Sequence, residues 1–163
     1  MVLLVGAPRL VSAVGDLINM GANMIGIGYE GLDLDALISR LRIRGVATIV
    51  DVRLSPISRK RGLSKTALRE RLINEGIGYE HLPALGNPRD NREGFGELQG
   101  DDARQARERF RDILESTAAQ IAMDRVHELA QSGTVALLCF EQDETRCHRE
   151  LVLSALRTRL ISI

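Results

Sequence analysis

Residues 24–52, MIGIGYEGLDLDALISRLRIRGVATIVDV, decide the fold. Met24 to Gly28 form a short apolar run, which predicts a buried strand. Apolar residues then recur at helical spacing until Gly45, a residue type that commonly follows the end of a helix, and Val46 to Val52 form a second apolar run. A strand, a helix and a strand in this order predict a right-handed βαβ unit with two parallel, buried strands.

The same alternation of strand and helix patterns continues to the C-terminus. The further predicted elements are a helix from Ser64 to Asn74, a strand from Ile77 to Leu82, a helical stretch from Asp101 to Gln131 that breaks near Ser116, a strand from Val135 to Phe140 and a helix from Thr145. Residues 83–100 are rich in proline and glycine and predict a long functional loop, a lid that brings Arg89 toward the site. The order of elements predicts the α/β class, with one three-layer Rossmann-like domain and a mostly parallel central sheet over residues 24–163.

Residues 1–23 precede this pattern. They are predicted to be an N-terminal extension, and a strand from Val2 to Val5 followed by a short helix is the alternative. No candidate site residue lies before Met24, so we expect the fold to tolerate removal of this segment.

The composition excludes several classes of protein. Hydrophobic residues make up 44% of the chain, which is enough to form a core and argues against disorder. Aromatic residues make up only 3% and Trp is absent, so a base-stacking surface for single-stranded nucleic acid is not expected. No signal peptide or membrane span is recognised and no membrane partner is expected, while two cysteines are too few for a disulfide framework and favour the reducing cytoplasm.

Polar residues lie at or just after the carboxyl end of each predicted strand. These residues are Glu30 after the first, Asp51 and Arg53 at the second, His81 at the third and Glu141 after the fourth. In parallel α/β sheets ligands bind outside the carboxyl ends of the strands. The sequence therefore predicts that these polar side chains meet at one edge of the sheet.

The segment after the second strand, DVRLSPISRKRGLSKT from Asp51, predicts an anion site. Its basic residues precede or enter the first turn of a helix, where free N–H groups and the helix dipole also favour negative charge. The candidate anion-binding residues are Arg53, Ser58, Arg59, Lys65 and Arg149. The alternative is a solvated basic face in which Asp51 pairs with Arg53 for structural reasons.

The segment LLCFEQDETRCHRE, which contains Cys139, predicts the chemistry. Cys147 is expected in a first helical turn beside Arg146 and Arg149, an environment that lowers a thiol pKa and favours the thiolate, whereas Cys139 is expected to stay protonated and shielded in its strand. The candidate catalytic residues are Cys147, His148, Glu141, His81 and Asp51.

Several familiar site motifs are absent from the chain. Arg146 follows Cys139 one residue too late for the phosphate loop of tyrosine phosphatases, and no Walker A, G-x-G-x-x-G or nucleophile-elbow motif occurs, so the cofactor is left unknown. Zinc held by Cys139, Cys147, His148 and His81 is an alternative, but C-x7-C-H is not a recognised ligand spacing and no metal site is predicted.

Several blocks in this order resemble the domain-of-unknown-function 488 family. They are GYEG, GVATIVDVRLSPISR, LSKTAL, GIGYEHLPALGNP, ALLCFE and CHR. The resemblance covers the chain from about Met24 onward and implies a compact α/β domain without an established reaction. The hallmark residues that it implies are Asp51, Arg53, Pro56, Ser58, Arg59, Ser64, Lys65, His81, Leu82, Gly86, Cys139, Glu141, Cys147, His148 and Arg149. The first 23 residues depart from the pattern, as does Leu63, where the family usually has Phe.

Three functions remain open from the sequence. The favoured one is binding of a phosphate-bearing small molecule or nucleotide at the carboxyl edge of the sheet, in an enzyme that acts as a hydrolase or transferase. The second is a nucleic-acid-binding module, because the stretch from Arg40 to Arg71 contains ten basic residues and only two acidic ones. The third is a thiol-based redox or metal-binding protein.

Overall fold

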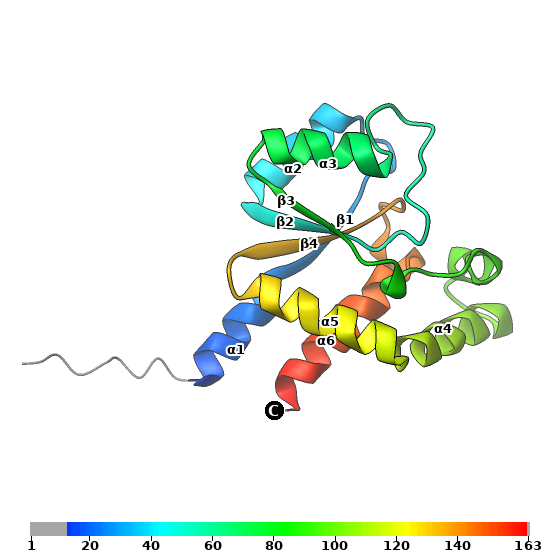
Figure 1. Cartoon of the computed structure of the whole chain (residues 1–163). Helices are drawn as coiled ribbons and strands as arrows, with labels where there is room; N and C mark the ends of the chain where they lie inside the picture. Colours follow the sequence, from blue (N-terminus) through cyan, green and yellow to red (C-terminus); the bar gives the residue numbers. More distant parts are fainter. Residues whose placement is uncertain (1–12, 163) are drawn as a thin grey trace, which may run out of the picture.

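A computed structural model describes residues 13–162, which are built around a four-stranded sheet (Figure 1). The strands are β1 (Met24–Gly28), β2 (Val46–Asp51), β3 (Gly78–His81) and β4 (Thr134–Cys139). Their order across the sheet is β1-β4-β2-β3, and every neighbouring pair is parallel. The predicted α/β class with a parallel, Rossmann-like sheet is confirmed.

Helices connect the strands. They are α1 (Ala13–Ala22), α2 (Leu34–Ile43), α3 (Lys65–Asn74), α4 (Asp101–Leu114), α5 (Thr117–Ala130) and α6 (Arg149–Ile161), with short 3-10 turns at η1 (Pro83–Leu85), η2 (Arg89–Asn91), η3 (Glu93–Gly96) and η4 (Glu144–Arg146). The predicted break near Ser116 is confirmed, because its side chain caps α5 by accepting a hydrogen bond from the Ala119 N–H at 3.2 Å. The N-cap of α4 is Gly100.

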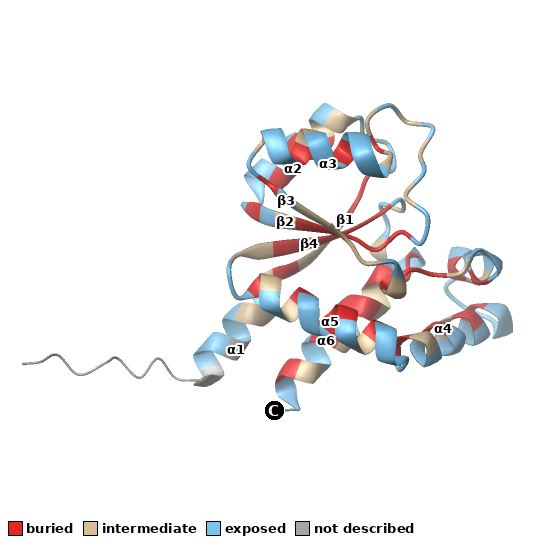
Figure 2. Cartoon of the chain, viewed as in Figure 1, coloured by how far each residue is buried: buried red, intermediate tan, exposed pale blue. Residues whose placement is uncertain are grey.

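The helices form one layer on each face of the sheet. In Figure 1, α2 and α3 cover one face, and α1, α4, α5 and α6 cover the other. Figure 2 shows the buried residues on the strands and on the helix sides that face them. Two separate hydrophobic clusters result, one between the sheet and each helix layer. The three-layer architecture follows from burying both faces of a parallel sheet.

Strand alternation decides which layer each side chain joins. Val135, Leu137 and Cys139 of β4 belong to the cluster under α4, α5 and α6. Ala136 and Leu138 belong to the cluster under α2 and α3. Side chains at the carboxyl edge are therefore distributed between the two faces of the sheet by their parity in the strand.

The N-terminal helix packs against this domain. Met20 of α1 is partly buried against the larger core cluster, which includes Leu160 of α6. Asn23 follows α1, and its carbonyl accepts a hydrogen bond from the Val135 N–H at 2.7 Å. The alternative strand from Val2 to Val5 lies outside the described residues, and the boundary at residue 24 stays a prediction. No helix within residues 13–162 is long and apolar enough to cross a membrane.

Candidate functional site

A pocket of about 370 Å³ opens at the carboxyl edge of the sheet. Its walls come from the segments that follow β1, β2 and β4 and from the loop between β3 and α4. The chain leaves β1 and β2 toward α2 and α3, and it leaves β4 toward α6 on the opposite face. Loops that diverge in this way leave a crevice between neighbouring strands, which is where open α/β sheets bind ligands.

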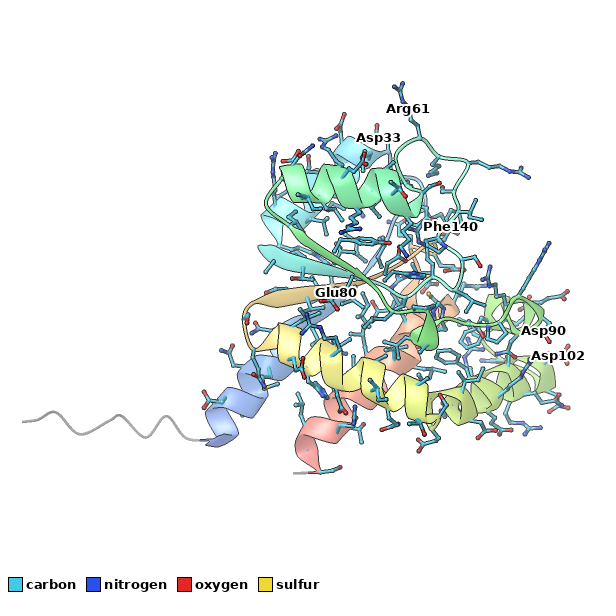
Figure 3. The ribbon with its side chains drawn as sticks, in the orientation of Figure 1. Asp33, Arg61, Glu80, Asp90, Asp102 and Phe140 are labelled. Carbon is cyan, nitrogen blue, oxygen red and sulfur yellow. The ribbon has the colours of Figure 1, made fainter. Side chains whose placement is uncertain are left out.

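The lining of this sheet-edge pocket carries a strong excess of positive charge. Five lining side chains are cationic and one is a carboxylate, Glu141. The cations are Arg53, Arg59, Lys60, Arg92 and Arg146. The exposed ring of Phe140 lies at the sheet edge and packs edge-on against Tyr29, with the ring centroids 5.4 Å apart (Figure 3).

Arg53 is held in a buried ion pair with Asp51. Its Nη2 lies 2.6 Å from Asp51 Oδ2 and its Nε lies 2.8 Å from Oδ1, while Nη1 donates to the Leu63 carbonyl at 2.7 Å. The Tyr79 hydroxyl donates to the same carboxylate at 2.6 Å. Burial opposes the charge on Arg53, but the bonds and charge of Asp51 outweigh it and raise the Arg53 pKa. Asp51 is fully buried and does not line the pocket. The Asp51–Arg53 pair of the alternative interpretation is present, but Arg53, Arg59 and Lys60 line a pocket and do not form a solvated basic face.

Cys139, Cys147 and His148 form a second buried group, the thiol–imidazole cluster. His148 Nδ1 lies 3.9 Å from Cys139 Sγ and 3.7 Å from Cys147 Sγ. The Cys139 thiol also donates to the Glu141 carboxylate at 3.3 Å. All four side chains line the pocket. The cluster lies on the face of α4–α6, whereas Asp51 and the Tyr29 ring lie on the face of α2 and α3.

The predicted place of Cys147 in a first helical turn, with a lowered thiol pKa, is wrong. Cys147 precedes α6, whose N-cap is His148, and is only 2% exposed, compared with 7% for Cys139. The interaction with Cys139 and then burial raise the pKa of Cys147, whereas the interaction with Cys147 lowers the pKa of Cys139 against the effect of burial. The two thiols share one environment, and the first charge formed there opposes the second. Burial and the nearby Cys139 sulfur also raise the Glu141 pKa.

The other predicted site residues divide between the pocket and its surroundings. Ser58 and Arg59 line the pocket. His81 and Lys65 do not; the His81 Nε2 contacts the Arg53 carbonyl at 2.7 Å and therefore supports the loop after β2. Arg149 is only 1% exposed and does not line the pocket, and its guanidinium donates to the Glu141 and Gln142 carbonyls.

The loop of residues 83–100 contributes side chains that the sequence did not single out. Asn87, Arg92 and Phe95 line the pocket, whereas Arg89, the residue expected to approach the site, does not. Arg92 Nε donates to the Asn87 carbonyl at 3.2 Å, which fixes it on the loop. These residues belong to short 3-10 turns that have no hydrophobic period, so the richness in proline and glycine was the only available signal.

The run of three basic residues from Arg59 to Arg61 divides at the pocket. Arg59 and Lys60 line it, and the Lys60 ammonium donates to the Leu32 carbonyl at 3.0 Å. In Figure 3, Arg61 points outward from the same loop, away from the sheet edge. Neighbouring residues of like charge therefore have different surroundings.

Comparison with known proteins identifies the family. Searches of curated proteins and of solved structures found no match to the chain. The model of one protein family matches residues 33–156, which include β2, β3, β4 and most of the lining of the pocket. The chain belongs to this family, the domain of unknown function DUF488.

Proposed function

We propose that the protein binds a phosphate-bearing small molecule or nucleotide in the sheet-edge pocket and acts on it as a hydrolase or transferase. The observation that carries this proposal is the lining of five cationic side chains against one carboxylate. The chain as a whole has no net charge, so this excess is a local property of the pocket. Concentrated positive charge in a concave site favours a compact, multiply charged anion.

The cations around the pocket differ in how free they are to meet a ligand. Arg53 is committed to Asp51, and Lys60 is committed to backbone carbonyls. Arg59 is exposed and has no hydrogen-bond or ion-pair partner among residues 13–162. Arg92 and Arg146 are exposed as well and are each bonded to a carbonyl of the loop 83–100. Arg59 is therefore the first candidate to meet a phosphate group.

The lining of the pocket also includes groups that can move protons. Glu141 and the thiol–imidazole cluster lie beside one another, at the end of β4 and in the segment after it, and they line the same pocket as Arg59. A carboxyl group within reach of a bound phosphate ester can act as a general acid or base. The thiols need a reducing compartment to remain free, and we propose the cytoplasm as the place of action.

Dispersal of the basic segment argues against the nucleic-acid alternative. Arg59 and Lys60 face the sheet-edge pocket, whereas Arg42 and Arg71 pair with Glu75. A duplex is expected to need a continuous basic surface that follows its phosphates. Charges that divide between a concave site and surface ion pairs with Glu75 support a small anion instead.

Binding of inorganic pyrophosphate and of ATP to the full chain tests the proposal by calorimetry. Arg59→Ala should weaken binding about tenfold or more, the scale of one charge-assisted hydrogen bond. Arg61→Ala removes the same charge from the same loop outside the pocket and should leave affinity unchanged. Glu141→Gln should retain binding and reduce the release of phosphate from ATP or its transfer to an acceptor.

Two results would contradict the proposal. One is the absence of binding by either probe. The other is equal loss with Arg59→Ala and Arg61→Ala, combined with tighter binding of a short DNA duplex whose affinity falls steeply with salt. The second result would favour the nucleic-acid-binding module.

A further inference from the structure

We propose that the thiol–imidazole cluster is a zinc site, with Cys139 Sγ, Cys147 Sγ and His148 Nδ1 as protein ligands. The three ligand atoms all lie within 4.8 Å of one another. All three residues are buried, and they are the only such group of histidine, cysteine and acidic residues within residues 13–162. Their spacing in the sequence, C-x7-C-H, gave no recognised ligand pattern, but the fold brings the side chains together.

The separations between the ligand atoms fit a tetrahedral ion. Bond lengths of about 2.3 Å to sulfur and 2.0–2.1 Å to nitrogen place sulfur and nitrogen ligands about 3.6 Å apart. The observed separations from His148 Nδ1 are 3.9 Å to Cys139 Sγ and 3.7 Å to Cys147 Sγ. Shifts of a few tenths of an ångström would bring both nitrogen–sulfur pairs to this separation. The two sulfur atoms lie within 4.8 Å of one another, and a tetrahedral ion would hold them about 3.8 Å apart.

His148 is oriented as a ligand by its other ring nitrogen. Its Nε2 lies 3.1 Å from the Val52 carbonyl, which can only accept a hydrogen bond. In the neutral ring the proton is then on Nε2, and the lone pair of Nδ1 points toward both thiols. Phe110 packs edge-on against the ring at a centroid distance of 5.2 Å and limits its rotation. Metal-ligating histidines are commonly held in this way by a backbone carbonyl.

The elements that supply the three residues make the site compact. Cys139 ends β4, η4 turns the chain back, and Cys147 and His148 then lead into α6. Cys139 is therefore fixed by a buried strand, and His148 is fixed by the start of a helix. Preformed sites on such elements lose little conformational freedom when they bind an ion.

Charge balance favours a divalent ion over an empty pair of thiols. On binding, each thiol gives up its proton to solvent, and two thiolates neutralise the two charges of Zn²⁺. Thiolate and imidazole ligands suit zinc, whereas Mg²⁺ and Ca²⁺ prefer oxygen. A neutral centre costs less to bury than a lone thiolate.

The fourth coordination position would face the sheet-edge pocket. Cys139, Cys147 and His148 line this pocket, and Glu141 lies beside Cys139 without being needed as one of the three ligands. Three protein ligands with an open position are typical of catalytic zinc sites and not of structural ones. Water or an oxygen of a bound ligand could fill this position, with Glu141 beside it to exchange a proton.

A disulfide between Cys139 and Cys147 is the competing chemistry. It would transfer two electrons to an external oxidant and release two protons, and it would leave His148 Nδ1 with no sulfur ligand to bind. Zinc binding uses all three atoms of the cluster and requires no oxidant. The experiment must therefore keep the protein reduced and measure the ligand atoms directly.

The test begins with the reduced, full-length protein after removal of metal with a chelator. Addition of Co²⁺ should produce the thiolate-to-cobalt charge-transfer band and the visible bands of a tetrahedral ion, saturating at one equivalent. Zn²⁺ should then displace the cobalt and protect both thiols from alkylation. Metal analysis of the protein as purified should find one zinc for each chain.

Matched variants locate the site. Cys139→Ser, Cys147→Ser and His148→Gln should each weaken zinc binding by about 100-fold or more, beyond the loss typical of residues that merely support a ligand. His81→Gln is the control, because His81 also contacts a backbone carbonyl through Nε2 but lies outside the cluster. It should bind zinc as the unsubstituted chain does, which also excludes the four-ligand set with His81.

The outcomes separate this proposal from the proposed function. If the reduced, folded chain gives no charge-transfer band with cobalt and retains no zinc, the zinc site is wrong, even if pyrophosphate still binds. If cobalt binds with unchanged spectrum after both cysteine substitutions, the cluster is not the site. If the zinc results hold but pyrophosphate and ATP do not bind, only the proposed function fails.

Discussion

At the scale of single residues, Asp51 shows that a carboxylate which the sequence places at the ligand-binding edge can be buried in an ion pair in the fold. It follows an apolar strand at the ligand-binding edge, which is the usual place for a functional acid. Its side chain nevertheless points to the face of α2 and α3, where Arg53 and Tyr79 surround it. The i, i+2 spacing of Asp51 and Arg53 puts both on one face of an extended chain, so the pairing could be predicted.

Asp51→Asn should destabilise the protein strongly. The substitution leaves the buried Arg53 guanidinium without its counter-charge, and breaking such a pair costs about 3–5 kcal/mol. Urea unfolding followed by circular dichroism measures the free energy of unfolding. Glu108→Gln, which removes one side of an exposed ion pair with Arg104, is the control and should leave the midpoint unchanged. Equal effects of the two substitutions would show that the Asp51 pair contributes no more to the free energy of unfolding than an exposed ion pair does.

The thiol–imidazole cluster was harder to predict at this scale. Cys147 and His148 were identified as site residues, but the sequence indicated the first turn of a helix for them and shielding for Cys139 alone. The turn at η4 and the packing of Phe110 on His148 bury them instead. Phe110 belongs to α4, far away in the sequence, and no local pattern indicates that contact. Burial by a distant element is therefore the part that a single sequence could not show.

At the scale of elements, periodic segments were predictable and the irregular loop was not. The four strands and the helices after them have apolar runs or apolar periodicity that identify them. Residues 83–100 instead contain three short 3-10 turns stabilised by side chains such as Asn91, whose amide donates to the Ala106 carbonyl at 2.9 Å. The contribution of this loop to the pocket depends on tertiary contacts with α4.

The contact between the end of β1 and the segment after β4 sets the position of Glu141. A Cβ at Gly28 would overlap the Glu141 carbonyl and lie 2.8 Å from Gln142 Cα. Gly28→Ala should therefore displace this segment, cost about 1–3 kcal/mol and weaken pyrophosphate binding. Gly96→Ala is the control, since a Cβ there meets no atom within 4 Å. Thermal unfolding measures the stability and calorimetry measures the affinity. If Gly28→Ala changes neither, this contact does not set the position of Glu141.

At the scale of the whole molecule, the strand order predicts that the two N-terminal elements, α1 and β1, contribute unequally to the stability of the fold. β4 lies between β1 and β2, so β1 covers one side of the most apolar strand. The family match begins at residue 33, beyond β1, although β1 pairs with β4 along its full length. α1 lies outside the sheet, and its main contacts are with α6 and β1. The two segments before residue 33 should therefore differ in importance.

Two truncations test this difference. A chain that begins at Asn23 keeps β1 and the bond from Val135 N–H to the Asn23 carbonyl, and loses the partly buried Met20 of α1. It should remain folded, with a melting temperature lower by a few degrees, the scale of about 1 kcal/mol for a domain of this size.

A chain that begins at Leu32 also loses β1 and Tyr29, which leaves β4 as an uncovered apolar edge strand. Such an edge favours association between chains, so this second chain should aggregate or fail to fold. Size-exclusion chromatography and thermal unfolding distinguish the two chains. A folded, monomeric chain without β1 would contradict the prediction, and it would show that residues 33–156 can bury β4 without their neighbour.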